Sequence, residues 1–411
     1  MTAQAVRARN SVFWTLCMMG LFAILSSTMS KNPVLKPFAS SLETPPELIG
    51  FVASASTIPG ILISLPAASL SDIFGRKKFL LIAGFVFASA PFLYLLITVW
   101  WQLILVRFYH GFATAIFVPV AEASIAGLFP SKRGERISFF SSATNIGRVI
   151  APTIGGYILD ATSRNFHMLY LGVGVAGVTA LIMALPFLAE RKETTTIVQA
   201  KAGETVKRLF SGWRIVITNR AVLIVGFVQA CLYYVFGSAE FYLAGYLPEV
   251  VHLDETLTGI IITSIIAVGI FSRPYMGRVS DRVGRRVPIA AGLVISALPL
   301  FAIPFVKDFW VLLLLAMVYG FGFATVTAST PALVSELVPK ELIGASIGFL
   351  DTIMDVGQAT GPIISGFIYA TGLRYLGLFP SLTLVLVISF VTFIISGVAK
   401  RQLSQENRST N

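Results

Sequence analysis

Charged and strongly polar side chains interrupt the apolar stretches of this 411-residue chain, and these are the residues that could do chemistry. Asp351, Asp355 and Gln358 recur at three- and four-residue steps, which place them on one face of a helix. An apolar setting disfavours the charged form of a carboxylate. Asp355, near the middle of its stretch, therefore suits a site that binds and releases a proton. A static buried pair with an arginine is the alternative, and Asp351 could simply be solvated near the helix end.

Other polar residues inside apolar stretches are candidates for a cavity or an ion pathway, because such residues are costly in a membrane. For proton coupling they are Arg107 and Glu122, and the latter could instead pair with Arg133 or Arg136. For substrate binding they are Lys31, Asn145, Arg148, Gln229, Tyr233 and Glu240. Aromatic residues around Tyr233 would suit flat, lipophilic cations through stacking and cation–π contact, although ordinary helix packing explains each of them equally well.

A short charged segment occurs twice, once as Ser71–Lys77 and again, 209 residues later, as Ser280–Arg286. Asp72 and Asp281 can accept backbone N–H groups at a helix N-terminus. Arg76 and Arg285 can pair with them, and Gly75 and Gly284 permit a tight turn. Each copy could act as a latch that holds two halves of the protein together on one side. The alternative is that the basic residues only fix the orientation of the chain.

The elements that position these residues are expected to be membrane helices. The chain is 55% hydrophobic and only 12% charged, with a mean hydropathy of +0.81, whereas a soluble domain carries about 25% charged residues. A spanning helix needs about 20 apolar residues. The hydropathy predicts twelve spans, at 11–30, 48–70, 79–98, 101–128, 138–159, 167–189, 220–247, 257–276, 287–305, 309–335, 343–370 and 375–399.

The repeat extends beyond the charged segment, so the predicted fold is all-α, with twelve helices in two pseudo-symmetric six-helix bundles. Gly111 and Pro130 match Gly320 and Pro339 at the same offset of 209 residues. The predicted domains are 1–189 and 220–411, the second ending in a short cytoplasmic tail. The polar segment 190–219 is predicted to be a cytoplasmic linker, either solvated or partly an interfacial helix through Val206, Leu209, Phe210 and Trp213.

The net charge of +11 is a topology signal rather than a sign of nucleic-acid binding. Most of the 31 Lys and Arg fall in one alternating set of loops, and the opposite loops and span ends hold only Lys31, Lys36, Arg164, Lys307 and Arg374. The positive-inside rule then places both termini and the basic loops in the cytoplasm. No basic face with interleaved aromatic residues appears, so nucleic acid is not an expected partner.

Two stripes of small residues are expected to let helix backbones approach closely. The first runs through Gly147, Ala151 and Gly155, with Pro152 and Gly156 beside it. The second runs through Gly357, Gly361 and Ser365, with Pro362 beside it.

On these residues the chain resembles the major facilitator superfamily along nearly its whole length. The two charged segments are similar to its loop motif Gly-x-Leu-x-Asp-x-x-Gly-Arg-[Arg/Lys], with Ala68 for the leading Gly of the first copy. Arg107 to Gly111 resembles its fourth-helix pattern, whose arginine the family associates with proton transfer. Because Arg107 is close to the helix start, its side chain could instead extend outward to solvent. Gly147 to Gly156 resembles the fifth-helix pattern of antiporters, especially drug–proton exporters, with Ala151 for the middle Gly. Asn32 to Pro37 is similar to their Pro-rich exit segment, but their first-helix acidic residue is not evident.

The expected function is secondary active transport by alternating access, most simply proton-coupled export of small organic molecules or drugs. An uptake permease or proton symporter for a metabolite, or a non-transporting receptor, remains open. No enzyme chemistry, cofactor or metal is expected, because His110, His167 and His252 lack metal-ligand spacing and no ATP-binding loop occurs. The expected partners are the substrate, protons and the bilayer of the cell membrane, and the protein is expected to be a monomer.

Overall fold

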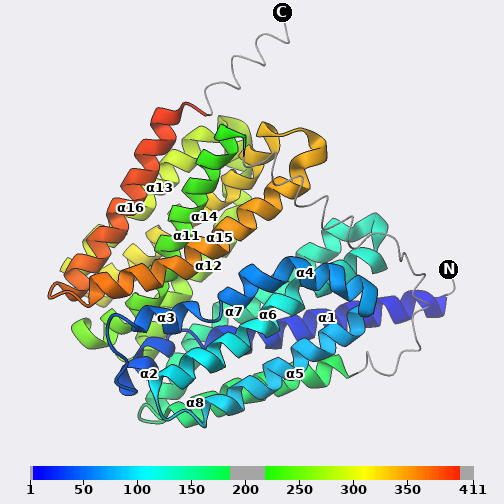
Figure 1. Cartoon of the computed structure of the whole chain (residues 1–411), viewed down its shortest axis with the longest axis horizontal. Helices are drawn as coiled ribbons and strands as arrows, with labels where there is room; N and C mark the ends of the chain where they lie inside the picture. Colours follow the sequence, from blue (N-terminus) through cyan, green and yellow to red (C-terminus); the bar gives the residue numbers. More distant parts are fainter. Residues whose placement is uncertain (1–2, 186–217, 399–411) are drawn as a thin grey trace, which may run out of the picture. The chain divides into compact units, whose positions relative to one another are not determined.

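The computed structural model describes residues 3–185 and 218–398 of the chain, and its regular structure in these ranges is helical (Figure 1). The predicted linker therefore lies outside the described residues, except for Thr218 and Asn219. Its possible interfacial helix lies outside them too, as does the C-terminal tail from residue 399.

The helices follow one another in the order expected from the hydropathy. In the first part of the chain they are α1 (Ala3–Met29), α2 (Leu35–Ser41), α3 (Ile49–Ser54), α4 (Ile58–Phe74), α5 (Arg76–Tyr94), α6 (Trp100–Leu128), α7 (Arg133–Ala161) and α8 (Phe166–Ala184). In the second part they are α11 (Arg220–Tyr246), α12 (Glu255–Val283), α13 (Arg286–Ala302), α14 (Phe309–Leu337), α15 (Ile343–Tyr369) and α16 (Arg374–Ser396). Short 3-10 turns occur at η1 (Pro130–Lys132), η3 (Ile303–Phe305) and η4 (Lys340–Leu342), and one π-helical turn, η2 (Leu247–Val251), follows α11.

Within the described residues, nine helices are long and apolar enough to cross a membrane. These are α1, α5, α6, α8, α11, α12, α13, α14 and α16. The other predicted spans are also helical, but α4 has only 17 residues, and α7 and α15 carry the polar stripes that lower their hydropathy. The all-helical membrane character of the prediction is thus confirmed.

The predicted span 48–70 differs from the structure because it contains a break. Helix α3 ends at Ser54, residues 55–57 form a turn, and α4 begins at Ile58. Pro59 explains the break, since it has no N–H to donate and its ring would clash with the carbonyl group four residues earlier. The turn lies against α6, where the carbonyl group of Ser56 occupies the space that a side chain at Gly111 would need.

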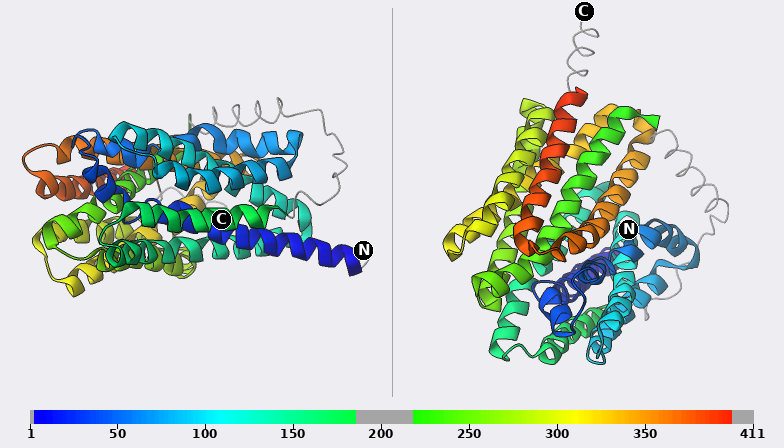
Figure 2. Two further views of the ribbon diagram at one scale, coloured as in Figure 1. Left: turned by 90° about the horizontal axis from the view of Figure 1, so that it is seen from below. Right: turned by 60° about the vertical axis from the view of Figure 1, so that its left-hand side comes forward.

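The helices assemble into two compact units. Among the described residues, unit 1 comprises 3–185 and 244–263, and unit 2 comprises 218–243 and 264–398. In unit 1, α1 packs on α7 and α8, and α5 packs on α6 and α8 (Figures 1 and 2). In unit 2, α13 packs on α14 and α16 (Figures 1 and 2). Unit 1 thus includes η2 with the adjoining ends of α11 and α12. The sequence analysis predicted a first domain of 1–189 and assigned these residues to the second domain, 220–411.

The first stripe of small residues forms a close helix contact in unit 1. Gly147 of α7 faces the backbone of Leu21 and Leu25 on α1, so that a Cβ at this position would overlap the Leu21 carbonyl oxygen. Farther along α7, Gly155 faces the carbonyl oxygen of Asn32, and Gly156 faces that of Glu255 at the start of α12. Helix α7 therefore packs backbone to backbone on α1 and on the first turn of α12.

The second stripe has the same role in unit 2. Gly357 of α15 faces the carbonyl oxygen of Ala230 on α11, and Gly361 faces that of Tyr234. The Tyr242 hydroxyl donates to the carbonyl oxygen of Pro362 at 3.2 Å. The two matching stripes in the sequence therefore correspond to two matching helix pairs.

Two ion pairs and a helix cap hold the connection between α11 and α12 in unit 1. Lys36 Nζ lies 2.8 Å from Glu249 Oε1, and Arg164 Nη2 lies 2.8 Å from Glu255 Oε1. Asp160, near the end of α7, accepts from the backbone N–H groups of Glu255 and Thr256 at 3.0 and 2.7 Å. A carboxylate at a helix N-terminus satisfies donors that have no partner within the helix. These contacts account for the inclusion of residues 244–263 in unit 1.

The close contact at Gly147 predicts a sharp steric limit. Gly147→Ala should lower the apparent melting temperature of the detergent-solubilised protein, because the added methyl group must push α7 away from α1. Overpacking of this kind costs about 1–3 kcal/mol. The control is Gly348→Ala on α15, where no atom lies within 4 Å of the added Cβ. Equal melting temperatures for the two variants would contradict the close packing.

The ion pair of Lys36 predicts a rescue by paired substitution. Lys36 is 1% exposed and Glu249 36% exposed, so Glu249→Leu removes the carboxylate from a buried ammonium group. We expect a destabilisation of about 1–3 kcal/mol, below that of a fully buried pair because Glu249 is partly solvated. Replacing both partners, as Lys36→Met with Glu249→Leu, should restore most of the stability in thermal unfolding. A double variant no more stable than the single one would rule out this account.

Candidate functional site

The first copy of the charged motif joins α4, α5 and α6. Gly75 connects α4 to α5 with φ of 98°, a conformation that side chains with a Cβ rarely adopt. Arg76 Nε donates to Asp72 Oδ1 at 2.8 Å, and its Nη1 donates to the carbonyl oxygen of Ala123 on α6 at 2.6 Å. The arginine therefore fixes the turn and also ties it to a third helix.

The second copy builds the same arrangement from α12, α13 and α14. Gly284 has φ of 82°. Arg285 pairs with Asp281, and its Nε donates to Glu336 Oε1 near the end of α14 at 2.8 Å. Burial acts to lower the pKa of the Arg285 guanidinium, but the hydrogen bonds and charges of Asp281 and Glu336 outweigh it, so that its pKa is raised above the ordinary value. Arg285 therefore stays charged and held by two carboxylates.

The contacts described for each copy lie within a single unit. The expected latch between the two halves therefore stays a prediction. The third partners, the Ala123 carbonyl group and Glu336, were not found from the sequence. The sequence repeat does not indicate these partners, because Arg76 binds a backbone oxygen whereas Arg285 binds a side chain.

Arg107 is part of a buried polar cluster in unit 1. Its side chain is 2% exposed, and Nη2 donates to the hydroxyl oxygen of Ser56 at 2.5 Å, in the turn between α3 and α4. One helical turn farther on, His110 Nδ1 lies 3.4 Å from the Tyr94 hydroxyl, and the Tyr94 ring stacks on Tyr170 with centroids 4.2 Å apart. The cluster keeps a fixed positive charge inside the helix bundle. Ser56 was missed from the sequence because the break before Pro59 was read as continuous helix.

Asp351 and Asp355 lie on α15, one turn apart. Asp355 is half-buried and Asp351 is exposed. Among the described residues, neither carboxylate forms an ion pair. Asp355 is thus the less solvated of two carboxylates on one helix face.

Aromatic and polar candidates gather on α11 and α14 in unit 2. The ring of Phe323 lies 5.2 Å from that of Tyr233 and 4.4 Å from that of Phe236, between ring centroids. Gln229 is buried and accepts from the Thr330 hydroxyl at 2.8 Å. Glu240 is 8% exposed, close enough to Tyr319 to act on its hydroxyl electrostatically. The structure therefore brings three of the predicted residues, Gln229, Tyr233 and Glu240, onto one helix that packs on α14.

The remaining candidates belong to unit 1 and are dispersed over several elements. Lys31 is half-buried in the turn after α1, and Glu122 is half-buried on α6. On α7, Asn145 is half-buried and Arg148 is exposed. Because the candidates are divided between the units, a single site formed by all of them stays a prediction.

Among the residues that the structure describes, no group of three or more His, Cys, Asp or Glu side chains could hold a metal ion. The arrangement offers instead carboxylates, fixed arginines and aromatic rings. These groups can bind, release and exchange cations without chemical conversion of a substrate.

The chain is similar to known membrane transport proteins. The chain is 23% identical over 340 residues to quinolone resistance protein NorA of Staphylococcus aureus strain COL, covering 82% of this chain and 84% of that protein. It is 25% identical over 330 residues to the multi-drug resistance efflux pump PmrA homolog of Lactococcus lactis subsp. lactis strain IL1403, covering 75% of this chain and 78% of that protein.

The fold is similar to that of a bacterial homolog to the human lysosomal transporter Spinster. The TM-score is 0.77 at 15% sequence identity, and the match covers 97% of this chain and 96% of that one. The family model of the Major Facilitator Superfamily matches residues 16–250 and 229–410, which include both copies of the charged motif and both glycine stripes. The chain therefore belongs to the Major Facilitator Superfamily of secondary transporters and is not an enzyme.

Proposed function

We propose that this transporter exports small organic molecules, drugs among them, in exchange for protons. Asp355 carries the proposal. Its carboxylate is half-buried within α15, an unfavourable place for a lasting negative charge. Among the described residues it forms no ion pair. A group that gains and loses a proton in each transport cycle explains its presence. Asp351 supplies a second, more solvated carboxylate on the same face.

Arg107 and Glu122 are proposed to assist proton coupling. Arg107 cannot give up its own proton, but its fixed charge can organise a nearby acidic group. Its burial against Ser56 removes the alternative in which the side chain extends out of the bundle to solvent. Lys31, Asn145 and Arg148 are proposed to line the substrate path, together with Gln229, Tyr233 and Glu240. The aromatic ring cluster around Phe323 suits flat, apolar cargo. The names of the two relatives, a quinolone resistance protein and a multi-drug resistance efflux pump homolog, agree with such cargo.

The proposed transport cycle uses twelve spanning helices in two six-helix bundles that expose a central cavity alternately to each side. The break in α3–α4 and the polar stripes of α7 and α15 do not prevent spanning, since polar groups can face a cavity instead of lipid. The two copies of the charged motif would then lie on the cytoplasmic side with both termini, and the protein would work as a monomer in the cell membrane.

Asp355→Asn tests proton coupling. In everted vesicles an imposed proton gradient should drive substrate accumulation by the unmodified protein, and the variant should accumulate no more than vesicles without the protein. The amide keeps the size of the side chain but cannot bind and release the proton. Glu341→Gln, at an exposed position of η4, is the matched control and should transport normally.

An unchanged gradient dependence in Asp355→Asn would remove this residue from the mechanism. Accumulation only in right-side-out vesicles would replace export with uptake by a permease or symporter. Absence of flux in either orientation, with substrate still bound, would favour a receptor.

Cysteine labelling tests the proposed orientation. In a background with Cys17→Ala and Cys231→Ala, a membrane-impermeant maleimide should label Ser131→Cys only from the cytoplasmic side and Ser163→Cys only from outside. Both serines are exposed, Ser131 in η1 and Ser163 in the turn after α7. The opposite pattern would invert the topology.

A further inference from the structure

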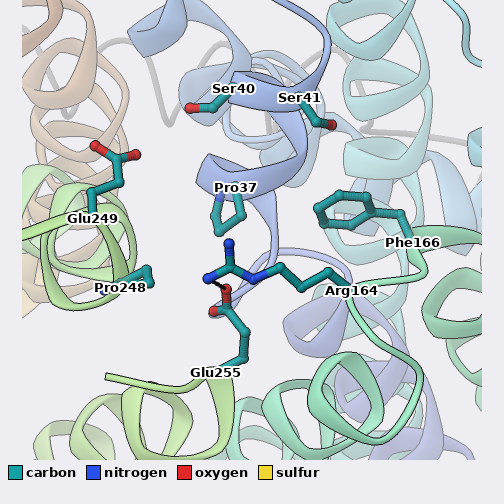
Figure 3. A pocket seen from close by; sticks show the side chains of 8 residues that line it. All are labelled: Pro37, Ser40, Ser41, Arg164, Phe166, Pro248, Glu249 and Glu255. Carbon is teal, nitrogen blue, oxygen red and sulfur yellow. Dashed lines mark ion pairs between the residues drawn. The ribbon is translucent and has the colours of Figure 1, made fainter. Parts of the chain in front are cut away.

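A cavity of about 290 Å³ lies in unit 1 at the connection between α11 and α12 (Figure 3). Its walls come from α2, from the turn between α7 and α8, and from the η2–α12 connection. The residues that matter here are Pro37, Arg164, Phe166, Pro248, Glu249 and Glu255. The volume lies just below the range for drug-sized ligands, about 300–1,000 Å³, so the cavity suits a small molecule.

Carboxylates outnumber cations around this cavity. Glu249 and Glu255 line it, Asp160 binds the backbone N–H of Glu255, and Asp254 precedes that residue in the chain. The positive charges paired with these groups are Lys36 on Glu249 and Arg164 on Glu255. The local formal charge is therefore negative, in contrast with the +11 of the whole chain. Such a cavity favours a cation.

Glu255 and Arg164 form an unequal pair. Glu255 is 1% exposed, whereas Arg164 is 59% exposed and reaches the cavity from a surface turn. Arg164 Nη2 lies 2.8 Å from Glu255 Oε1. A buried carboxylate needs a positive partner, but an exposed arginine gains little from any one partner because water solvates it equally well. Arg164 is thus a counterion that another cation can replace.

The cavity wall identifies the kind of cation. No described group of acidic, His or Cys residues could hold a metal ion, so a bare metal has too few ligands. Phe166, Pro37 and Pro248 supply apolar surface beside the carboxylates, as Figure 3 shows. An ammonium group carried on an aromatic or aliphatic body would place its charge on Glu255 and its body against these residues, with a cation–π contribution from Phe166.

We propose that this cavity is a binding site for organic ammonium ions, which take the place of Arg164 on Glu255. In the proposed export function it would be an additional transient binding site for cargo, formed by other residues than Asp355 and the aromatic cluster on α11 and α14. Occupation of the site would release the Arg164 side chain from the first residue of α12, while the Asp160 cap would still hold the end of α7 there. This biological role rests on the proposed function, but the binding itself does not.

Thermal unfolding of the purified full-length protein tests the site, with benzyltrimethylammonium as the probe. Its permanent charge keeps proton binding out of the measurement. A ligand that binds the folded protein raises the apparent melting temperature with concentration, so the unmodified protein should show a saturable rise at constant ionic strength. Glu255→Gln should abolish the rise. Glu47→Gln, an exposed acidic residue between α2 and α3, is the matched control and should keep it.

Arg164→Ala separates a binding site from a structural ion pair. If Arg164 competes with the ligand, its removal should tighten binding of benzyltrimethylammonium by about two- to fivefold, the usual value of one solvent-exposed ion pair. If the pair only stabilises the fold, Arg164→Ala should lower the melting temperature and leave the ligand affinity unchanged, which would overturn the proposal. Because this variant keeps Glu255, it remains informative even where Glu255→Gln fails to fold.

Failure of this inference and failure of the export function are distinguishable. If benzyltrimethylammonium did not raise the melting temperature of the unmodified protein, while gradient-driven transport in vesicles was intact, the cation site would be overturned and the export function would stand. Ligand binding that follows Glu255 and Arg164 as described, without gradient-driven transport, would support the site and refute export.

Discussion

Close approach of helix backbones, allowed by glycines, is the constraint on which the rest of this structure depends. In lipid the hydrophobic effect does not drive helices together, so association relies on close packing and on polar contacts. Helix α7 meets α1 at Gly147, and α15 meets α11 at Gly357, each with a carbonyl oxygen in the space of the missing side chain. Once these pairs are fixed, the polar residues on the neighbouring faces of α7 and α15 have fixed directions too. The glycines thus determine where Asn145 and Asp355 can point.

Ion pairs and hydrogen bonds of basic side chains provide further stabilisation at the helix ends. Arg76 and Arg285 each use one nitrogen for the aspartate of their own motif and another for a third helix. Each turn is thereby held to the bundle rather than left as a surface loop. At the far end of unit 1, Lys36 and Arg164 do the same for the α11–α12 connection. In the part of the chain that the structure describes, these four basic residues are thus used where helices must be joined.

Much of the fold could be predicted from the sequence, because a chain in lipid has few alternatives to helices. The spans, the turn glycines and the small-residue stripes depend on local composition and spacing, and these can be read directly. The break before Pro59 was missed because the residues on both sides are equally apolar. The roles of Ser56, Glu336, Glu249 and Glu255 could not be predicted, since each depends on a partner far away in the chain. The candidate proton and cargo sites were predicted as residue types, but which of them act together depends on how the helices are arranged.

Two helices belong to both compact units, and this has a mechanical consequence. Helix α11 passes from unit 2 into unit 1 at residues 243–244, and α12 returns from unit 1 to unit 2 at residues 263–264. Their hydrogen-bonded backbones are stiff rods rather than loose tethers. In the proposed alternating access, a movement of one unit against the other would therefore have to bend or twist both helices near these positions, so the stiffness of α11 and α12 would oppose it.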